Sequence, residues 1–347
     1  MGNRMVFRIA VVGVGMFGRL QALACAQHDG LRLVAVSGRS KERAQQVGQE
    51  LDVPWYTDVR ALLSEQQFDA AIVATPEDVR PEIAALLASA GKHLLLEKPL
   101  AATVEGCDSI VAAVRGAGVI ALVDFSLRFE PRYVAVKEAI EAGRLGEIIT
   151  VAARRNGTIV GARRYGKWTG LLISTAIHEI DLMTWYAGPV ERVSAEITFR
   201  NSPYPGLEAA ALATFRFRSG AIGALETSWA RPQGVPDRLD ARCEVVGTAG
   251  AATVSLASHG LRVTEGGTTT FPDLSYWPVS RGRPGGALRA ALDHFVRCLR
   301  GDESLIATVE DGREAVRLVL AIKEAAARGG PVLVPEHVAD GTEETHL

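Results

Sequence analysis

A short apolar stretch near the start of the chain runs directly into a Gly-x-Gly-x-x-Gly turn. Residues 7–12 favour a strand, and residues 16–27 favour a helix. Between them, Gly13 permits a tight turn, Gly15 lets backbone approach a pyrophosphate, and Gly18 lets helix and strand pack closely. The helix N-terminus then offers unpaired N–H groups to the phosphates. This order of strand, turn and helix predicts a dinucleotide site.

Length and composition restrict the class of protein. The 347 residues exceed what one core usually fills, so we expect two domains. The chain is 48% apolar and 22% charged, with a net charge of −2, which argues against nucleic acid as the main partner. No apolar stretch approaches the roughly 20 residues of a membrane helix. The four cysteines lie far apart, which favours neither a metal site nor disulfides and fits the cytoplasm.

Short apolar runs alternate with helix-like segments from residue 6 to about residue 124. The runs are almost continuously apolar, as expected for strands that are covered on both faces. This pattern predicts an α/β fold with a doubly wound parallel sheet, a Rossmann domain, over residues 1–124. The expected strands are 9–12, 31–36, 70–74, 93–96 and 119–123, and the expected helices are 16–27, 41–51, 59–65, 81–90 and 104–117.

The pattern changes after residue 124. Longer alternating segments predict an α+β domain, over residues 125–335, with an open and mainly antiparallel sheet. Its expected strands are 148–155, 193–199, 209–217, 222–229, 239–246 and 251–256, and its expected helices are 131–143 and 177–186. An amphipathic helix at 310–328 ends at a Gly-Gly-Pro sequence, and we expect it to pack back on the first domain. Residues 336–347 are polar and predict a flexible tail.

The end of the second strand bears on the choice of cofactor. An NAD-preferring site places an acid there to accept hydrogen bonds from the adenosine ribose. Residues 37–41 contain no acid; Ser37, Arg39 and Ser40 stand there instead. A guanidinium group matches a phosphate, whereas an acid repels it. The sequence therefore predicts a preference for NADP, with NAD also possible.

Two separate positions carry the predicted chemistry. Lys98 follows the strand at 93–96, and ligands of open α/β sheets bind beyond the carboxyl ends of strands. A lysine can act as a general acid/base once burial or a nearby cation lowers its pKa. In a later helix, Ser174, His178 and Asp181 fall on one face.

Several ordered segments resemble the glucose–fructose oxidoreductase and inositol dehydrogenase family, the Gfo/Idh/MocA group. They span nearly the whole chain: residues 13–18, 74–76, 90–93, 97–100, 128–131, 178–181 and 330–335. The resemblance implies a Rossmann domain followed by an α/β domain whose open sheet supports a homo-oligomer, a dimer or a tetramer. It also implies hydride transfer between nicotinamide and a secondary alcohol or ketone of a sugar, cyclitol or amino sugar.

The resemblance also assigns roles to individual residues. Lys98 resembles the family's catalytic lysine and His178 its catalytic histidine. The implied cofactor contacts, added to Gly13, Gly15, Gly18, Ser37, Arg39 and Ser40, are Met16, Phe17, Thr75, Pro76, Glu97 and Lys98. The implied substrate contacts are Lys98, Arg128, Arg164, Tyr165, Ser174, His178 and Asp181. No metal is implied.

The chain departs from the family pattern at several positions. Ser174 stands where many members carry Asp or Asn, and Glu77 and Arg80 replace an Asn and a His. A serine can hydrogen-bond but carries no charge. Arg154, Arg155 and the basic segment 163–168 are compatible with a carboxylate, a phosphate or a nucleotide-linked sugar, or with an exposed loop. Two other functions therefore stay open: a dinucleotide-binding sensor, and an enzyme that uses transient oxidation for elimination or glycoside cleavage.

Overall fold

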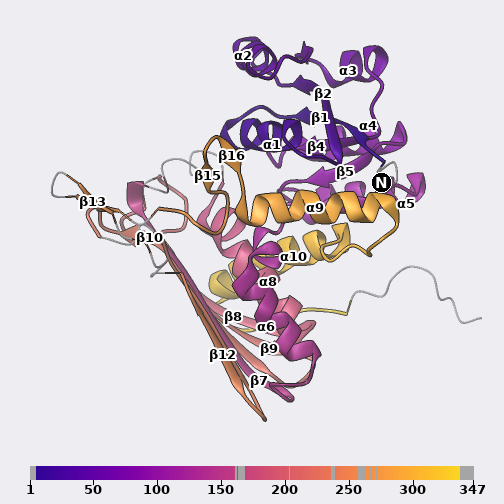
Figure 1. The fold of residues 1–347 in the computed structure, drawn as a ribbon. Helices are drawn as coiled ribbons and strands as arrows, with labels where there is room; N and C mark the ends of the chain where they lie inside the picture. The colour runs from indigo at the N-terminus through magenta and orange to yellow at the C-terminus, as the bar shows by residue number, and fades with distance from the viewer. Residues whose placement is uncertain are drawn as a thin grey trace, which may run out of the picture.

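Two large sheets, each with its own helices, form the frame of the molecule (Figure 1). The computed structural model describes residues 5–160, 162, 169–202, 204–235, 239–256, 261, 263–265, 268–270 and 272–336. The predicted tail 337–347 lies outside these residues, as do Arg164 and Tyr165. Within the described residues, no helix has both the length and the apolar character needed to cross a bilayer.

The first sheet has six strands in the order β3-β2-β1-β4-β5-β6, all parallel. β4 is entirely buried, because helices cover both faces of the sheet. The strands are β1 (Phe7–Val12), β2 (Leu31–Ser37), β3 (Trp55–Tyr56), β4 (Ala70–Val73), β5 (His93–Leu96) and β6 (Ala121–Val123). The helices are α1 (Met16–Ala26), α2 (Lys41–Leu51), α3 (Val59–Glu65), α4 (Arg80–Ser89) and α5 (Val104–Ala117). The predicted doubly wound sheet is confirmed; only the two-residue β3 was not expected.

The second sheet has seven strands in the order β12-β11-β7-β10-β9-β8-β17. Every neighbouring pair is antiparallel except β7 and β10, which run parallel. The strands are β7 (Ile148–Thr158), β8 (Val190–Thr198), β9 (Ala210–Phe217), β10 (Ile222–Arg231), β11 (Leu239–Gly247), β12 (Ala251–Ser255) and β17 (Val332–Leu333). Helices α6 and α8 lie on one face, and among the described residues Figure 1 shows no helix on the other. The predicted open and mainly antiparallel sheet is confirmed.

The remaining elements connect and brace the two sheets. They are the short helix η1 (Ser126–Phe129), α6 (Pro131–Glu141), the π-helical turn η2 (Leu172–Ala176), α8 (Ile177–Ala187), α9 (Gly286–Arg300) and α10 (Val309–Arg328). Two small hairpins pair β13 (Val263–Glu265) with β14 (Thr268–Thr270) and β15 (Val279–Ser280) with β16 (Arg283–Pro284). Helix α9 was not predicted, although its buried residues follow a helical period.

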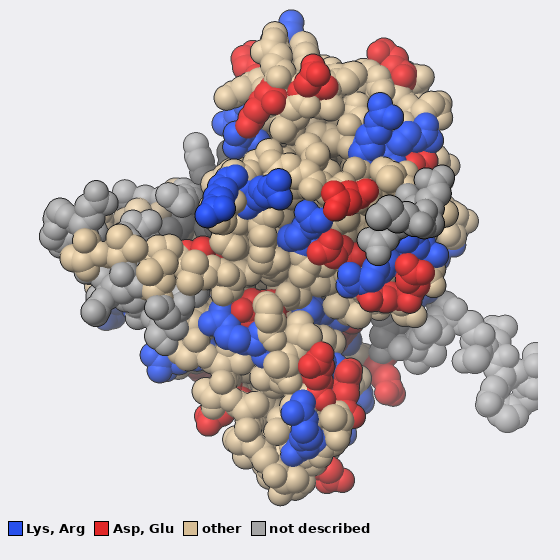
Figure 2. All heavy atoms as spheres, viewed as in Figure 1, with Lys and Arg blue, Asp and Glu red and all other residues tan. Residues whose placement is uncertain are grey.

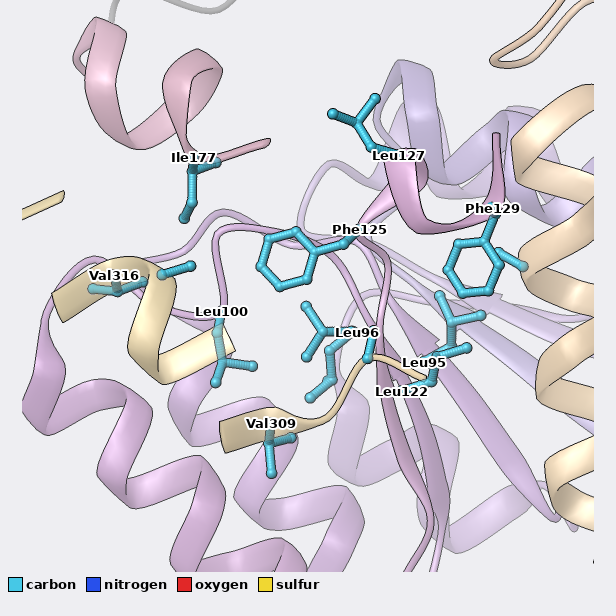
Figure 3. Close-up of a cluster of buried hydrophobic side chains, with 14 of the residues drawn as sticks. Leu95, Leu96, Leu100, Leu122, Phe125, Leu127, Phe129, Ile177, Val309 and Val316 are labelled. Carbon is cyan, nitrogen blue, oxygen red and sulfur yellow. The ribbon is translucent and has the colours of Figure 1, made fainter. Parts of the chain in front are cut away.

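Apolar packing between the two sheets fixes the loop that carries Lys98. Helix α10 contacts α5 beside the first sheet and α8 and β8 in the second part. Figure 3 shows Leu96, Leu100 and Phe125 packed near Val309 of α10 and Ile177 of α8. Leu100 is completely buried two residues after Lys98. This packing therefore fixes the position of the loop after β5 relative to the start of α8.

Candidate active site

The glycine turn after β1 has the shape that a diphosphate requires. Gly13 has a φ of +100°, and a Cβ there would come within 2.5 Å of the Ala74 backbone. A Cβ on Gly18 would lie 1.8 Å from the Gly13 carbonyl oxygen. A Cβ on Gly15 would meet nothing within 4 Å, and no side chain caps α1. The turn thus leaves open space in front of free helix N–H groups, and its residues fit a dinucleotide.

The adenosine end of this cradle lies between β2 and α2. Ser37 is the buried last residue of β2, and Arg39 is exposed. Ser40 caps α2, because its hydroxyl accepts a hydrogen bond from the Arg43 N–H at 3.4 Å. The same hydroxyl donates to the Glu42 carboxylate at 2.9 Å. One acid therefore stands in the first turn of α2, after the acid-free end of β2.

A buried arginine holds the loop that carries Lys98. The Arg80 guanidinium donates to the carbonyl of Glu97 at 2.7 Å and also to the carbonyls of Pro99 and Thr75. Thr75 and Pro76 follow β4, so this guanidinium ties together the chain segments that follow two neighbouring strands. The sequence showed Arg80 only as a departure from the family pattern. The structure makes it the clamp of the Lys98 loop.

Lys98 reaches across from the first sheet to the second part of the chain. Its Nζ donates to the main-chain carbonyl of Ser174 at 2.8 Å. That carbonyl belongs to the π-helical turn η2, a kind of turn that is frequent at functional sites. Burial lowers the pKa of Lys98 to about 8; Glu97 opposes this shift and Arg155 reinforces it. Lys98 can therefore exchange a proton near neutral pH.

His178 lies on α8, one turn beyond this contact. Its Nδ1 is buried and has no hydrogen-bond partner among the described residues. Burial, with the positive charges of Lys98 and Arg155, holds the pKa of His178 well below its usual value. The imidazole is therefore neutral at physiological pH and free to bond to a ligand.

Next to Lys98, the side-chain amide of Gln21 binds two buried acids. The Gln21 side-chain amide donates to the carboxylates of Glu97 at 2.8 Å and Asp124 at 3.1 Å. Burial raises the pKa of both acids, and the charge of Asp124 raises that of Glu97 further. Two adjacent buried carboxylates do not both ionise readily, so the pair keeps a proton to higher pH than exposed acids would. No sequence pattern pointed to Gln21 or Asp124, because their proximity arises only from the fold.

A cavity of about 440 Å³ collects these groups. Of the predicted site residues, it is lined by Met16, Phe17, Glu97, Lys98, Ser174 and His178. The Phe17 and Trp277 rings meet edge to face, 5.3 Å apart, so an aromatic pair joins its two sides. Sequence reasoning missed the lining residues Tyr276 and Trp277 and named Arg155 only as one basic residue of several.

Two predicted substrate contacts lie elsewhere. Arg128 and Asp181 do not line this cavity and bind each other through contacts of 3.0 Å and 2.6 Å. Both side chains are buried. Arg128 also donates to Asp311 at 3.1 Å and to the Ile306 carbonyl. The pair thus joins η1, α8 and α10 into one frame around the cavity.

Comparisons with known proteins agree with this architecture. Residues 7–125 match a family model described as an oxidoreductase family with an NAD-binding Rossmann fold, and residues 137–334 match its C-terminal alpha/beta domain. The scyllo-inositol 2-dehydrogenase (NAD(+)) of Bacillus subtilis is 29% identical over 94% of this chain and 95% of its own. The inositol 2-dehydrogenase 1 of Saccharopolyspora erythraea is 30% identical over 95% of this chain and 97% of its own.

Solved structures show the same fold. The scyllo-inositol dehydrogenase of Lactobacillus casei, with bound NAD(H) and scyllo-inositol, superposes with a TM-score of 0.81 at 20% identity, over 94% of this chain and 99% of that one. The WlbA dehydrogenase of Bordetella pertussis, in complex with NADH and UDP-GlcNAcA, superposes with a TM-score of 0.79 at 28% identity, over 95% of this chain and 99% of that one. The chain is therefore an enzyme of the oxidoreductase class, and it belongs to the Gfo/Idh/MocA family.

Proposed function

We propose that the chain is an NAD(P)-dependent dehydrogenase or reductase that acts on a secondary alcohol or ketone of a sugar-like or cyclitol-like substrate. The observation that carries this proposal is the position of Lys98. Lys98 lines the same cavity as His178 and as Met16 and Phe17 of the phosphate cradle. Relatives named as inositol dehydrogenases support the substrate class.

The reaction needs one hydride and one proton to leave the alcohol. A nicotinamide cofactor held on the Gly13–Gly18 turn would supply the hydride acceptor. Neutral Lys98 takes the hydroxyl proton, and the Ser174 carbonyl orients its amine toward the cavity. Neutral His178 hydrogen-bonds the same oxygen and holds it in place. In the reverse direction, protonated Lys98 returns the proton to the ketone oxygen.

Replacing Lys98 by Met tests this assignment. We expect kcat to fall about 10²- to 10⁴-fold, the usual contribution of a positioned acid/base, while the NAD(P)H Kd stays unchanged. The matched control is Lys92→Met, because Lys92 lies at the other end of β5 and donates to the Phe68 carbonyl. Undiminished turnover in Lys98→Met would overturn the role of Lys98. Cofactor binding without turnover of any alcohol in the wild type would favour a sensor.

For the cofactor, we propose a preference for NADP over NAD. Exposed Arg39 supports it, and residues 37–41 hold no acid to repel a 2′-phosphate. This preference would distinguish the chain from its NAD(+)-named relative. We expect kcat/KM to favour NADP about tenfold or more and Arg39→Ala to remove the difference, since a charge-assisted hydrogen bond contributes about 1.5–3 kcal/mol. Higher kcat/KM with NAD would overturn it.

We also propose that the bare face of the second sheet supports a homo-oligomer. This face bears Leu212, which is 60% exposed, and a shallow hollow of about 890 Å³ flanked by Arg154 and Glu226. An exposed apolar side chain ringed by ion-paired charges is typical of protein interfaces. By contrast, Figure 2 shows positive and negative side chains interspersed on the face in view, without the continuous basic area that a polyanion needs. Sedimentation equilibrium measures the number of subunits.

A further inference from the structure

The two walls of the cavity differ in the charges they present. All of its lining carboxylates, Glu77, Glu97 and Asp124, come from the first-sheet side. The wall from the second part includes Arg155, Ser174, Thr175, His178, Tyr276 and Trp277, and it has no carboxylate among the described residues. A polyol needs strong acceptors for its hydroxyl protons as well as donors. On its described residues, this wall is rich in donors and poor in strong acceptors.

The hydroxyls on this wall are already engaged. The Ser174 hydroxyl donates to the Gly170 carbonyl at 2.7 Å. The Thr175 hydroxyl oxygen accepts the Trp229 indole N–H at 3.0 Å. The main-chain carbonyl of Ser174 is taken by Lys98. These oxygens keep a lone pair, but a hydroxyl is a weaker acceptor than a carboxylate, so the described part of this wall offers a neutral polyol no strong acceptor.

Arg155 is the unusual member of the wall. It lies on β7 with only 6% of its surface exposed. Its Nε donates to both Glu179 oxygens, at 2.6 and 2.7 Å, and its Nη2 donates to the Tyr276 hydroxyl at 3.1 Å. Its Nη1 makes no hydrogen bond within the described part of the chain and keeps access to the cavity that the residue lines. A rigid guanidinium edge thus faces the cavity unpaired, while its counter-ion Glu179 is not part of the lining.

We infer that the substrate carries a carboxylate in addition to the reacting alcohol, and that Arg155 Nη1 binds this carboxylate. The inference rests on the proposed function and names the substrate class of the same site. A carboxylate accepts hydrogen bonds from Arg155 without needing an acceptor in return, and this leaves Lys98 to the reacting hydroxyl. Trp277, which is 37% exposed, offers ring surface to the carbon skeleton of a sugar-sized acid such as a uronate or an aldonate.

The direct test compares ligands that differ only in charge. Isothermal titration calorimetry and initial rates are measured for D-glucuronate and its neutral analogue D-glucuronamide, and for gluconate, galacturonate, myo-inositol and glucose 6-phosphate. We expect the acids to bind and react about ten- to a hundredfold better than the amide and the neutral polyol. Equal values for acid and amide, or no measurable binding of any acid, would overturn the inference. Tighter binding of glucose 6-phosphate than of the acids would show that the cavity recognises a phosphate and not a carboxylate.

A pair of variants tests the same wall without disturbing Arg155. Ser174→Asp adds an acid to the cavity, and Ser174→Asn adds an amide of the same size. We expect Asp to weaken glucuronate binding about tenfold or more, while Asn changes it far less, because only Asp repels the carboxylate. Equal effects of both would contradict the inference. If neutral polyols react and acids show no advantage, the proposed function stands and the inference fails. If no alcohol reacts while glucuronate still binds, only the proposed function fails.

Discussion

Two buried arginines bind acids of the same helix, α8, yet they differ in what they leave free. Arg128 uses Nε and Nη2 on Asp181 and Nη1 on Asp311 and a carbonyl. Arg155 uses Nε on Glu179 and Nη2 on Tyr276, and its Nη1 stays without a partner among the described residues. Only Arg155 lines the cavity. Hydrogen-bond saturation of the guanidinium, more than burial or charge, therefore separates an arginine that only supports the fold from one that can bind a ligand.

The strongest effect should come from replacing Arg128, whose three guanidinium nitrogens are all hydrogen-bonded. Arg128→Gln should lower the free energy of unfolding by about 3–5 kcal/mol, because it leaves Asp181 buried without its partner. The KM for substrate should not change in the protein that remains folded, since Arg128 does not line the cavity. Urea unfolding and initial rates check both parts. A raised KM with little loss of stability would break the comparison and return Arg128 to the substrate site.

Replacing both Arg155 and Glu179 by neutral residues should weaken ligand binding more than it lowers stability. In the double variant Arg155→Gln, Glu179→Gln, no buried charge is left alone, so we expect less destabilisation than in Arg128→Gln. The KM for a carboxylate substrate should rise about ten- to a hundredfold, while that for its amide stays similar. Measurements on both substrates separate a lost contact from a general loss of structure. A parallel rise in both KM values would mean that Arg155 serves only the framework.

The smallest effect should appear in the pH profile. Alcohol oxidation needs neutral Lys98, so its kcat should rise with pH and level off above about 8, whereas ketone reduction should fall over the same range. Arg155 lowers the pKa of Lys98, so Arg155→Gln should move both limbs to higher pH. Arg128→Gln should leave them in place, because Arg128 is not among the groups that shift Lys98. Identical shifts in the two variants would contradict this distinction.

What could be predicted from the sequence depended on the range of the interactions. The glycine turn, the strand before Lys98 and the helix of His178 carry local patterns, so the fold class and these positions followed from the residues. The hydrogen-bond partners of a guanidinium group need not be close to it in the sequence. Arg128 meets Asp181 and Asp311 across 53 and 183 residues, and nothing near Arg128 reveals those partners.

The same limit applies to the other groups that were not foreseen. Gln21 and Asp124 are 103 residues apart and meet because helix α1, which carries Gln21, lies against the same sheet whose strand β6 ends just before Asp124. Arg80 lacks a carboxylate partner in the described structure and binds carbonyls, which no motif encodes. Helix α9 was missed although its periodic apolar positions were present, so a signal for it existed.

The contact between Lys98 and η2 has a consequence for how such an enzyme can diversify. The amine is anchored on a main-chain carbonyl, and every amino acid supplies one at that position. The side chain at 174 is thereby released from holding the proton-transfer group. An exchange there can redirect the enzyme toward a new substrate while the chemical step is inherited intact, so position 174 is a natural starting point for directed evolution.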